Sequence, residues 1–362
     1  MKILTKEQYW HFLGVLLVFF LVSCDQAPTE TDSDDVEKKE LILYNWEDYT
    51  PQNILEQFEK ETGIKVVLKE FQTADEQIAV LQSKPDFCDL LMVDVDEAIT
   101  ILEPLKIIEK LDRTRMVVDH EPHALFRDAE SYGVPYGIGL LGFAVDKRYV
   151  DLAFKDCRFL IADEKFKGKI SLLDEPVDIF YMLMNAVGVS MNSENETDHQ
   201  HAYDFGTRLK KMMPKFQDVY SGLDDLNEGE VWIAMAYSGD TLLYQEDNSN
   251  IEFIYSLDRP CVWRDLLCLN MNAPNKENAY KFMEFINSPQ VAAEISLQFK
   301  SAPAVAGAEK YMDRESLSNP LINMPDSLLK ICEKQERVKE NNAAINRLYL
   351  HLSNQSKGVG DD

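Results

Sequence analysis

The sequence predicts an α/β fold in two lobes, each a mixed sheet flanked by helices, with strands that cross between the lobes. At 362 residues the chain is too long for one ordinary core, and 45% hydrophobic residues are enough to fill two. Apolar runs at residues 41–44 and 64–68, with a helical pattern between them, form a βαβ unit. The glycines and proline of residues 132–139 indicate a bend or crossing strand.

The first βαβ unit has clear helix boundaries. Thr50 is the expected N-cap and Pro51 the first helical residue. Gly63 fits the C-cap, because glycine readily adopts the left-handed conformation found there. The apolar face of this helix carries Ile54, Leu55 and Phe58. This helix is therefore expected to cover one face of a parallel sheet.

The remaining elements follow in order along the chain. Further strands are expected at residues 89–93, 168–173 and 231–237, and from residue 262 onward. Further helices are expected at residues 76–83, 179–187, 275–286 and 289–299. Pro176 is expected to be the first residue of the helix that continues to residue 187. The alternation of strands and helices is typical of α/β lobes.

Carboxylates follow the strands at residues 41–44 and 89–93 where each one ends, and aromatic rings accompany them after the former. Trp46, Asp48 and Tyr49 come after residues 41–44, and Asp94 and Asp96 come after residues 89–93. Ligands of open α/β sheets bind outside the carboxyl ends of the strands. Aromatic faces and carboxylates both attract positive charge, which predicts a cationic ligand. The alternative is that the rings pack the strand–helix corner and the acids are solvated.

The charge of the chain restricts its partners. The formal net charge is -26 and the pI is near 4.6. Nucleic acid and anionic membrane surfaces are therefore excluded as expected partners, and a cationic ligand remains compatible.

The N-terminus has the pattern of a targeting segment. Lys2 and Lys6 precede an apolar run at residues 12–21 that is too short to span a bilayer comfortably. The run closes on Ser23 and Cys24, which resembles a bacterial lipobox; the alternative is an ordinary cysteine in a secretory signal. Residues 1–23 are then a signal peptide, Cys24 the lipidated N-terminus, and residues 24–39 an acidic tether. Asp25 resembles the signal that retains lipoproteins in the inner membrane, so we expect a periplasmic protein anchored there.

The other cysteines and the histidines predict neither a disulfide framework nor a metal centre. Cys88, Cys157, Cys261, Cys268 and Cys332 are odd in number and show no C-x-x-C spacing. Most are expected to be buried free thiols, with one disulfide pair left open. His199 and His201 stand in or beside a polar stretch and are expected in a solvated loop.

Six segments of the chain resemble one known family. They read YNWEDYTPQNILEQFEKETGIKVV, DLLMVDVDE, YGVPYGIGLLGFAVD, FKGKISLLDEPVDIF, GEVWIAMAYSGD and VWRDLLCLN. In this order and spacing they resemble the spermidine/putrescine-binding proteins of bacterial polyamine ABC transporters, over residues 41–304. The resemblance implies a type II periplasmic binding protein fold that closes on its ligand. It places one lobe at residues 40–144 and 265–310, and the other at residues 145–264 and 311–362.

The resemblance also implies a set of ligand contacts. The aromatic wall is Trp46, Tyr49, Tyr237 and Trp263, with Tyr237 where the family usually has tryptophan. The carboxylates are Glu175, Asp178 and Asp265, and Gln335 is the implied amide contact. Asp48 and Asp240 fall where putrescine-preferring members tend to have aspartates. Such groups can replace water around ammonium groups.

Departures from the family pattern leave the ligand's identity open. Asp94 and Asp96 stand where family members often have serine and tyrosine, and Lys300 stands where a tyrosine is common. An added acid either holds another amine or selects a different cation, and the lysine is an alternative partner for Asp96. Out of context, Glu175 and Asp178 read as helix caps, and Tyr237 and Trp263 as core rings.

The sequence therefore predicts a lipid-anchored solute-binding protein that captures putrescine or spermidine and delivers it to an inner-membrane ABC permease. We expect a monomer without cofactor or metal and without enzymatic activity, because no nucleophile, P-loop or dinucleotide motif appears. The alternatives are a sensory module for a polyamine or related cation, and an enzyme on the same scaffold.

Overall fold

The computed structural model describes residues 39–116, 123–152, 156–336 and 342–353. The signal segment, Cys24 and the tether up to residue 38 lie outside these ranges. Among the described helices, none has both the length and the apolar character required to cross a membrane. The same ranges hold no group of three or more His, Cys, Asp or Glu suited to a metal ion.

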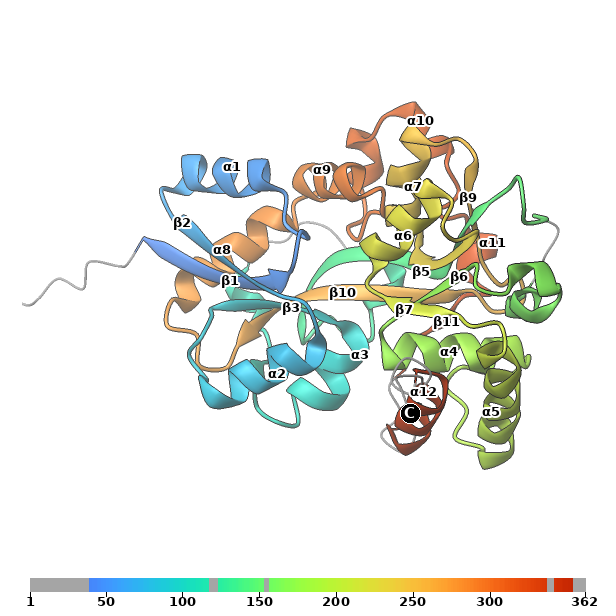
Figure 1. Ribbon diagram of the computed structural model, residues 1–362. Coiled ribbons are helices and arrows are strands. Elements are labelled where there is room, and N and C mark those ends of the chain that lie inside the picture. The colour runs from blue at the N-terminus through green and yellow to red at the C-terminus, as the bar shows by residue number, and fades with distance from the viewer. Residues whose placement is uncertain (1–38, 117–122, 153–155, 337–341, 354–362) are drawn as a thin grey trace, which may run out of the picture. The chain divides into compact units, whose positions relative to one another are not determined.

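The described strands form one eleven-stranded sheet (Figure 1). Its main path has the order β2-β1-β3-β10-β5-β8-β6-β7, with β4 and β11 paired to β10 and β9 paired to β5. The strands are β1 (Glu40–Trp46), β2 (Lys65–Phe71), β3 (Leu90–Asp94), β4 (Ile108–Glu109), β5 (Gly133–Asp146), β6 (Ile170–Leu173), β7 (Lys215–Gln217), β8 (Ile233–Tyr237), β9 (Ile251–Ile254), β10 (Cys261–Asn270) and β11 (Glu333–Lys334). The long strands β5 and β10 join the two ends of this sheet.

The pairing directions confirm the expected βαβ unit. β1 is parallel to β2 and to β3, whereas β10 is antiparallel to both β3 and β5. β5 in turn is antiparallel to β8, and β8 is parallel to β6. The segment 132–139 is thus the start of a crossing strand, as its glycines predicted. Parallel strands at each end and antiparallel strands in the centre make a mixed sheet.

The helices that the sequence predicted lie close to the expected positions. The full set of described helices is α1 (Gln52–Thr62), α2 (Ala74–Ser83), α3 (Val95–Glu97), α4 (Pro176–Ala186), α5 (Glu196–Lys210), α6 (Val219–Glu228), α7 (Ser238–Asp247), α8 (Lys276–Ile286), α9 (Pro289–Phe299), α10 (Arg314–Ser318), α11 (Asp326–Leu329) and α12 (Asn342–Ser353). Of these, the sequence predicted α1, α2, α4, α8 and α9. α1 ends at Gly63 in the left-handed conformation, as expected. Its start was predicted one residue too early: Pro51 is the N-cap, and the Thr50 hydroxyl accepts a hydrogen bond from Asn45.

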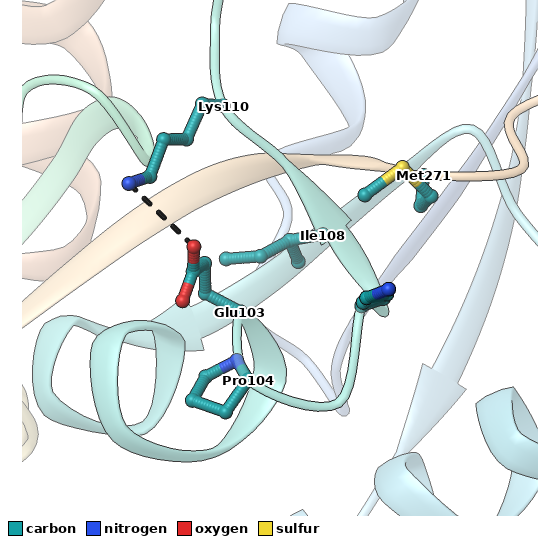
Figure 2. Close-up of a pocket in the computed structure, with 6 residues that line it drawn as sticks. Glu103, Pro104, Ile108, Lys110 and Met271 are labelled. Atoms are coloured by element: carbon teal, nitrogen blue, oxygen red, sulfur yellow. Dashed lines mark ion pairs between the residues drawn. The ribbon is translucent and has the colours of Figure 1, made fainter.

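A surface hollow lies beside β4. It has a volume of about 520 Å³ and is lined by Glu103, Pro104, Lys106, Ile108, Lys110 and Met271 (Figure 2). Lys110 and Glu103 form an ion pair of 3.5 Å there. None of the predicted ligand contacts lines this hollow.

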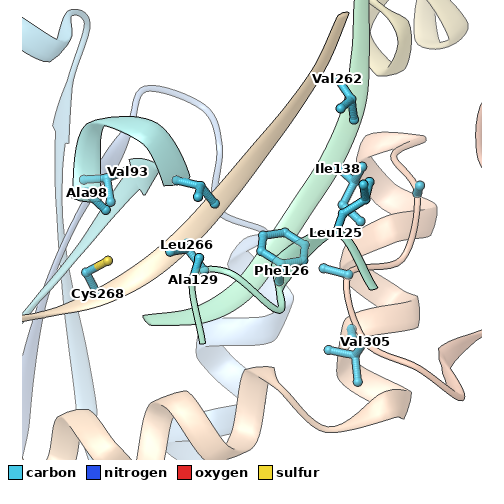
Figure 3. Packing of buried hydrophobic residues seen from close by; sticks show 14 of the residues in the cluster. Val93, Ala98, Leu125, Phe126, Ala129, Ile138, Val262, Leu266, Cys268 and Val305 are labelled. Carbon is cyan, nitrogen blue, oxygen red and sulfur yellow. The ribbon is translucent and has the colours of Figure 1, made fainter. Parts of the chain in front are cut away.

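One hydrophobic core packs around the middle of the sheet. Side chains of β3, β5 and β10 meet Phe126 and Val305, which come from segments far apart in the sequence (Figure 3). Phe126 and Leu266 are fully buried. This core holds β10 firmly where it passes from β3 to β5.

The structure shows how far the cysteines and His199 are buried. Cys88, Cys157, Cys261 and Cys268 are buried free thiols, and Cys332 is a partly buried one, so no disulfide links them. The solvated-loop expectation for His199 was wrong, because α5 extends through it and leaves it only 6% exposed. Its Nε2 lies 2.7 Å from the Ser193 carbonyl oxygen. The helical spacing of His199, Ala202 and Phe205 was the missed signal.

A buried cation on β10 gives a test of this packing. The Arg264 side chain is 4% exposed, and its Nη1 donates to Asp128 at 2.8 Å. We expect Asp128→Ala to lower the free energy of unfolding by about 1–2 kcal/mol, because a buried charge loses its partner while Asp128 itself is partly solvated. Denaturant unfolding measures the change.

Glu103→Ala is the matched control. Glu103 pairs with Lys110, whose side chain is 55% exposed. Its removal should cost less than about 1 kcal/mol. Equal losses in the two variants would show that the Arg264 pair has no special role.

Candidate functional site

A buried asparagine shapes the turn after β1. Asn45 is fully buried, and its Nδ2 donates to the Tyr49 carbonyl at 2.8 Å and to the Thr50 hydroxyl at 2.6 Å. Within the turn, Asp48 is exposed and has a positive φ of 57°. The ring of Trp46 is half-buried and lies 4.3 Å from that of Phe71. The turn therefore holds Tyr49 at a fixed place beside the end of β1.

The Tyr49 side chain reaches across to β5 and β10. Its ring packs against Tyr136 at 5.3 Å and Phe299 at 4.9 Å. Burial, and then the charge of Asp265, raise the pKa of Tyr49 well above its ordinary value. The phenol therefore stays protonated and can donate to the Asp265 carboxylate.

A β-bulge adjusts β5 beside this contact. The register between β10 and β5 shifts after Asp265, which lies opposite Gly137, whereas Leu266 lies opposite Pro135. Tyr136 is the extra residue, and its hydroxyl donates to the Tyr49 carbonyl at 3.0 Å. Proline is tolerated inside a sheet at such a bulge. The bulge thus directs Tyr136 toward the turn after β1.

Trp263 lies against glycines of β5. It is paired with Gly139, where a Cβ atom would stand 2.4 Å from the indole ring. At Gly137 a Cβ atom would stand 2.5 Å from the Tyr49 hydroxyl oxygen and 3.2 Å from the same indole ring. The two glycines therefore let both rings approach the backbone. Within the described residues the buried Trp263 Nε1 has no hydrogen-bond partner.

Asp178 links the start of α4 to two other strands. It is 8% exposed and accepts hydrogen bonds from the Tyr237 hydroxyl at 2.6 Å and from Gln335 Nε2 at 3.0 Å. Tyr237 ends β8, and its ring meets that of Trp263 edge-on at 6.2 Å. Gln335 follows β11. Side chains of α4, β8 and β10 and of the residue after β11 thus meet here.

Asp94 brings a second carboxylate next to Asp265. The two residues are paired across β3 and β10. Asp94 also caps α3, because its Oδ1 accepts from the Asp96 N–H at 2.7 Å. Asp96 is 8% and Glu97 5% exposed. After burial, the charges of Asp94 and then Glu97 raise the pKa of Asp265, so these two acids of the segment lie within electrostatic reach of the Asp265 carboxylate.

The charges of Asp240 and Asp48 reach Tyr220, a residue that the sequence did not single out. Burial, followed by the charges of Asp240 and Asp48, raises the pKa of Tyr220. Burial also raises the pKa of Asp240 to about 7. Tyr220 stands near the start of α6 and gave no motif of its own.

The carboxyl groups of the site resist ionisation. Burial, and then Asp178, raise the pKa of Glu175 to about 8. Burial raises the pKa of Asp178 to about 6, although the hydrogen bonds from Tyr237 and Gln335 oppose the shift. Burial, and then Asp94, raise the pKa of Asp265 well above its ordinary value. A cation would supply the countercharge that favours their ionised forms.

The observed contacts disagree with the interpretation of Glu175 as a helix cap and of Trp263 and Tyr237 as core rings. Glu175 is the N-cap residue of α4, but its side chain makes no capping hydrogen bond. Trp263 and Tyr237 are each half-buried rather than enclosed in a core. The Lys300 ammonium pairs with Glu246 at 2.6 Å. The predicted cluster is therefore continuous from Tyr49 through Asp265 and Trp263 to Tyr237 and Asp178, whereas Trp46 packs on Phe71.

The sequence analysis also missed Tyr136 and Phe299. Both rings pack on Tyr49. For Tyr136 a signal existed, because Pro135 inside a crossing strand implies a bulge that would direct its neighbour differently. Phe299 ends α9, and its position gave no comparable signal.

The approach of Trp263 to β5 can be tested by Gly139→Ala. The new methyl group would overlap the indole ring, so we expect the free energy of unfolding to fall by about 1–3 kcal/mol and tryptophan fluorescence to change. Gly206→Ala in α5 is the control, since its nearest neighbours lie 3.7 Å away and alanine favours a helix by about 1 kcal/mol. An unaltered emission spectrum in Gly139→Ala would contradict the contact.

The raised pKa of Glu175 gives a pH test. The folded protein binds the Glu175 proton more tightly than the unfolded chain does. The stability contributed by the protonated carboxyl group is therefore lost as the pH rises from about 4.3, the ordinary pKa of glutamate, through about 8, its pKa in the folded protein. We expect the free energy of unfolding of the wild type to fall relative to Glu175→Gln over that window. Urea unfolding at several pH values measures the difference.

Glu194→Gln is the control for this comparison. Glu194 is exposed, so its replacement should leave the pH dependence as in the wild type. Parallel stability curves for the wild type and Glu175→Gln would contradict the raised pKa.

Comparisons with known proteins agree with this geometry. The model of the family described as bacterial extracellular solute-binding protein matches residues 53–321. A spermidine/putrescine-binding periplasmic protein of Salmonella typhimurium is 26% identical over 319 residues, covering 86% of this chain and 91% of the relative. The putrescine-binding periplasmic protein PotF of Escherichia coli is 29% identical over 322 residues, covering 80% and 84%.

A solved structure shows the same fold. The crystal structure of the TpPotD lipoprotein of Treponema pallidum matches with a TM-score of 0.75 at 20% identity, covering 86% of this chain and 98% of that one. The two-lobed type II periplasmic binding protein fold that the sequence predicted is thereby confirmed.

Proposed function

Because the chain belongs to the family of bacterial extracellular solute-binding proteins, we propose that it captures a polyamine, putrescine or spermidine, for uptake by an ABC transporter. The names of the two relatives described above state that they bind one or both of these compounds. One observation carries the proposal: Tyr49, Trp263 and Tyr237 lie in one cluster with Asp265 and Asp178. The rings suit methylene groups, and the carboxylates suit the ammonium groups of such a ligand.

The electrostatics of the cluster favour a ligand with more than one positive charge. Glu175 and Asp178 stand at the start of α4, while Asp265 and Asp94 are paired on β10 and β3. A diamine would place one ammonium group near each pair, with its methylenes against Trp263. Each ring contributes about 0.5–2 kcal/mol of cation–π attraction. The ligand would thereby regain part of the hydration energy that it loses on binding.

The other predicted contacts take secondary places in this proposal. The charges of Asp240 and Asp48 reach Tyr220, and there they would attract a cationic ligand. Gln335 orients the Asp178 carboxylate through its hydrogen bond. Trp46, packed on Phe71, would close the wall beside Tyr49. The lobe boundaries given above, which split β5 and β10, belong to the same proposal.

The cellular setting of the proposal rests on the N-terminal sequence. Cys24 would carry the lipid and residues 24–39 would tether a monomer to the outer face of the inner membrane, beside its permease. The Treponema pallidum neighbour is itself named a lipoprotein. Delivery to a permease makes and breaks no bond, so we propose no enzymatic step.

Asp265→Asn tests the site directly. The amide keeps the shape of the side chain but leaves an ammonium group without its countercharge, so putrescine and spermidine should bind about 30-fold more weakly or worse. Titration calorimetry on the full-length chain measures the affinities. Asp258→Asn, an exposed position before β10, is the control and should bind as the wild type does.

Two results would contradict the proposal at different levels. Wild-type protein that binds neither putrescine, spermidine nor spermine lacks the proposed function. Wild-type protein that binds them with an affinity unaffected by Asp265→Asn uses another site.

A further inference from the structure

The connection between α4 and α5 lies against the segment that carries Gln335. β11 pairs with β10 only through Glu333 and Lys334, so Gln335 is the first residue beyond that pairing. Gln335 is nonetheless only 9% exposed, and its Nε2 reaches the Asp178 carboxylate at 3.0 Å. Support for the residue that orients Asp178 therefore has to come from outside this strand pairing.

Asn192 gives that support with both ends of its side-chain amide. Its Nδ2 donates to the Lys334 carbonyl at 2.9 Å, and its Oδ1 accepts from the Glu336 N–H at 3.0 Å. These two backbone groups flank Gln335, so the amide brackets Gln335 as one residue of a parallel neighbouring strand would. The backbone of Gln335 is thereby held on both sides.

The connection that carries Asn192 is itself anchored. Met191 is fully buried in the hydrophobic core that includes α4. Its N–H donates to the Glu333 carboxylate at 3.3 Å, and the Ser190 hydroxyl donates to the same carboxylate. Asn192 therefore follows two residues that already tie this connection to β11.

The fold does not depend on the two bonds of Asn192. Asn192 is half-buried and Glu336 is exposed, so water can replace the amide at the same backbone groups. Water would not fix the position of Gln335 relative to α4. The two bonds therefore act on where Gln335 lies more than on whether the chain folds.

We propose that Asn192 is a positioning residue for polyamine binding, which holds Gln335 where its amide orients the Asp178 carboxylate toward the ligand. The proposal rests on the proposed polyamine function. An oriented carboxylate binds an ammonium group more tightly, because less side-chain freedom is lost on binding. Asn192 acts through Gln335 and not through a contact with the ligand.

Asn192→Ala, alone and combined with Gln335→Ala, tests this relation. Titration calorimetry on the full-length chain should show that putrescine binds Asn192→Ala about five-fold more weakly than the wild type. In the Gln335→Ala background the same change should alter the affinity less than about two-fold, because the amide that Asn192 positions is already gone. Equal losses in the two backgrounds, or no loss in the first, would overturn the proposal.

Asn248→Ala is the matched control. Asn248 is also half-buried and also uses both ends of its amide: its Nδ2 donates to Asn227 at 2.9 Å, and its Oδ1 accepts from the Asn250 N–H at 3.1 Å. It follows the end of α7, and its loss should leave the putrescine affinity unchanged. An equal loss of affinity in this variant would show a general effect of lost loop bonds and overturn the proposal.

The pH dependence of the affinity is a second readout, and it decides where Gln335→Ala binds too weakly to titrate. Burial raises the pKa of Asp178 to about 6, and the hydrogen bond from Gln335 opposes that shift. A protonated Asp178 has no countercharge to offer, so the affinity falls as the pH drops through this pKa. If Gln335 is displaced the pKa rises further, and the loss of putrescine affinity in Asn192→Ala should begin at a higher pH than in the wild type. An unshifted profile would overturn the proposal. The other titratable groups around Asp178, which the substitution leaves in place, are Glu175, Tyr181, Asp94, Tyr237 and Cys261.

The outcomes separate this inference from the function on which it rests. Wild-type protein that binds neither putrescine nor spermidine would overturn the polyamine function and the positioning role with it. Polyamine binding by the wild type, with equal losses in the two backgrounds or an unshifted pH profile, would overturn the positioning role alone. If Asn192→Ala does not fold, Asn192→Ser, whose side chain is too short to join both backbone groups, takes its place with the same outcomes.

Discussion

The antiparallel pairing of β10 with β5 is the constraint on which the site depends. It sets Trp263 opposite Gly139 and Asp265 opposite Gly137, and on its other edge β10 sets Asp265 opposite Asp94. Because Gly137 and Gly139 have no Cβ atom, the Trp263 indole and the Tyr49 hydroxyl fit against β5. One strand thereby combines a ring and a carboxylate on the face that receives side chains from β1, α4 and β8.

The alternation of β10 also removes positive charge from this face. Arg264 lies between Trp263 and Asp265, so its side chain points to the opposite side of the sheet, where Asp128 holds it. Lys334 of the neighbouring β11 pairs with the same carboxylate. Both cations thus pair with Asp128. Among the acids of the site, burial raises the pKa of Asp94 and outweighs the opposing charge of Arg264.

Much of the fold could be predicted because local signals agree with it. The apolar runs, Gly63 and Pro176 each correspond to a strand, a helix end or a helix start in the structure. His199 was misplaced because the polar residues around it suggested a loop, whereas its spacing from Ala202 and Phe205 fits the buried face of α5.

The candidate site was predicted less completely, for a physical reason. Tyr49 could be named because it follows a strand, and Trp263 and Asp178 because the family resemblance implied them. The contacts of Tyr136 depend on a register shift in β5, and those of Phe299 depend on how the end of α9 reaches the Tyr49 ring. Such tertiary relations leave no periodic pattern in the chain.

The raised carboxyl pKa values explain how an acidic site can exist without its ligand. Near neutral pH the protein holds protons on groups such as Glu175 and Asp240, and those protons reduce the repulsion that full ionisation would bring. An amine bound as proposed would replace the protons with positive charges that also make hydrogen bonds and pack on rings. Binding would then exchange protons for ligand, and selectivity would follow from which cations satisfy the carboxylates better than protons do.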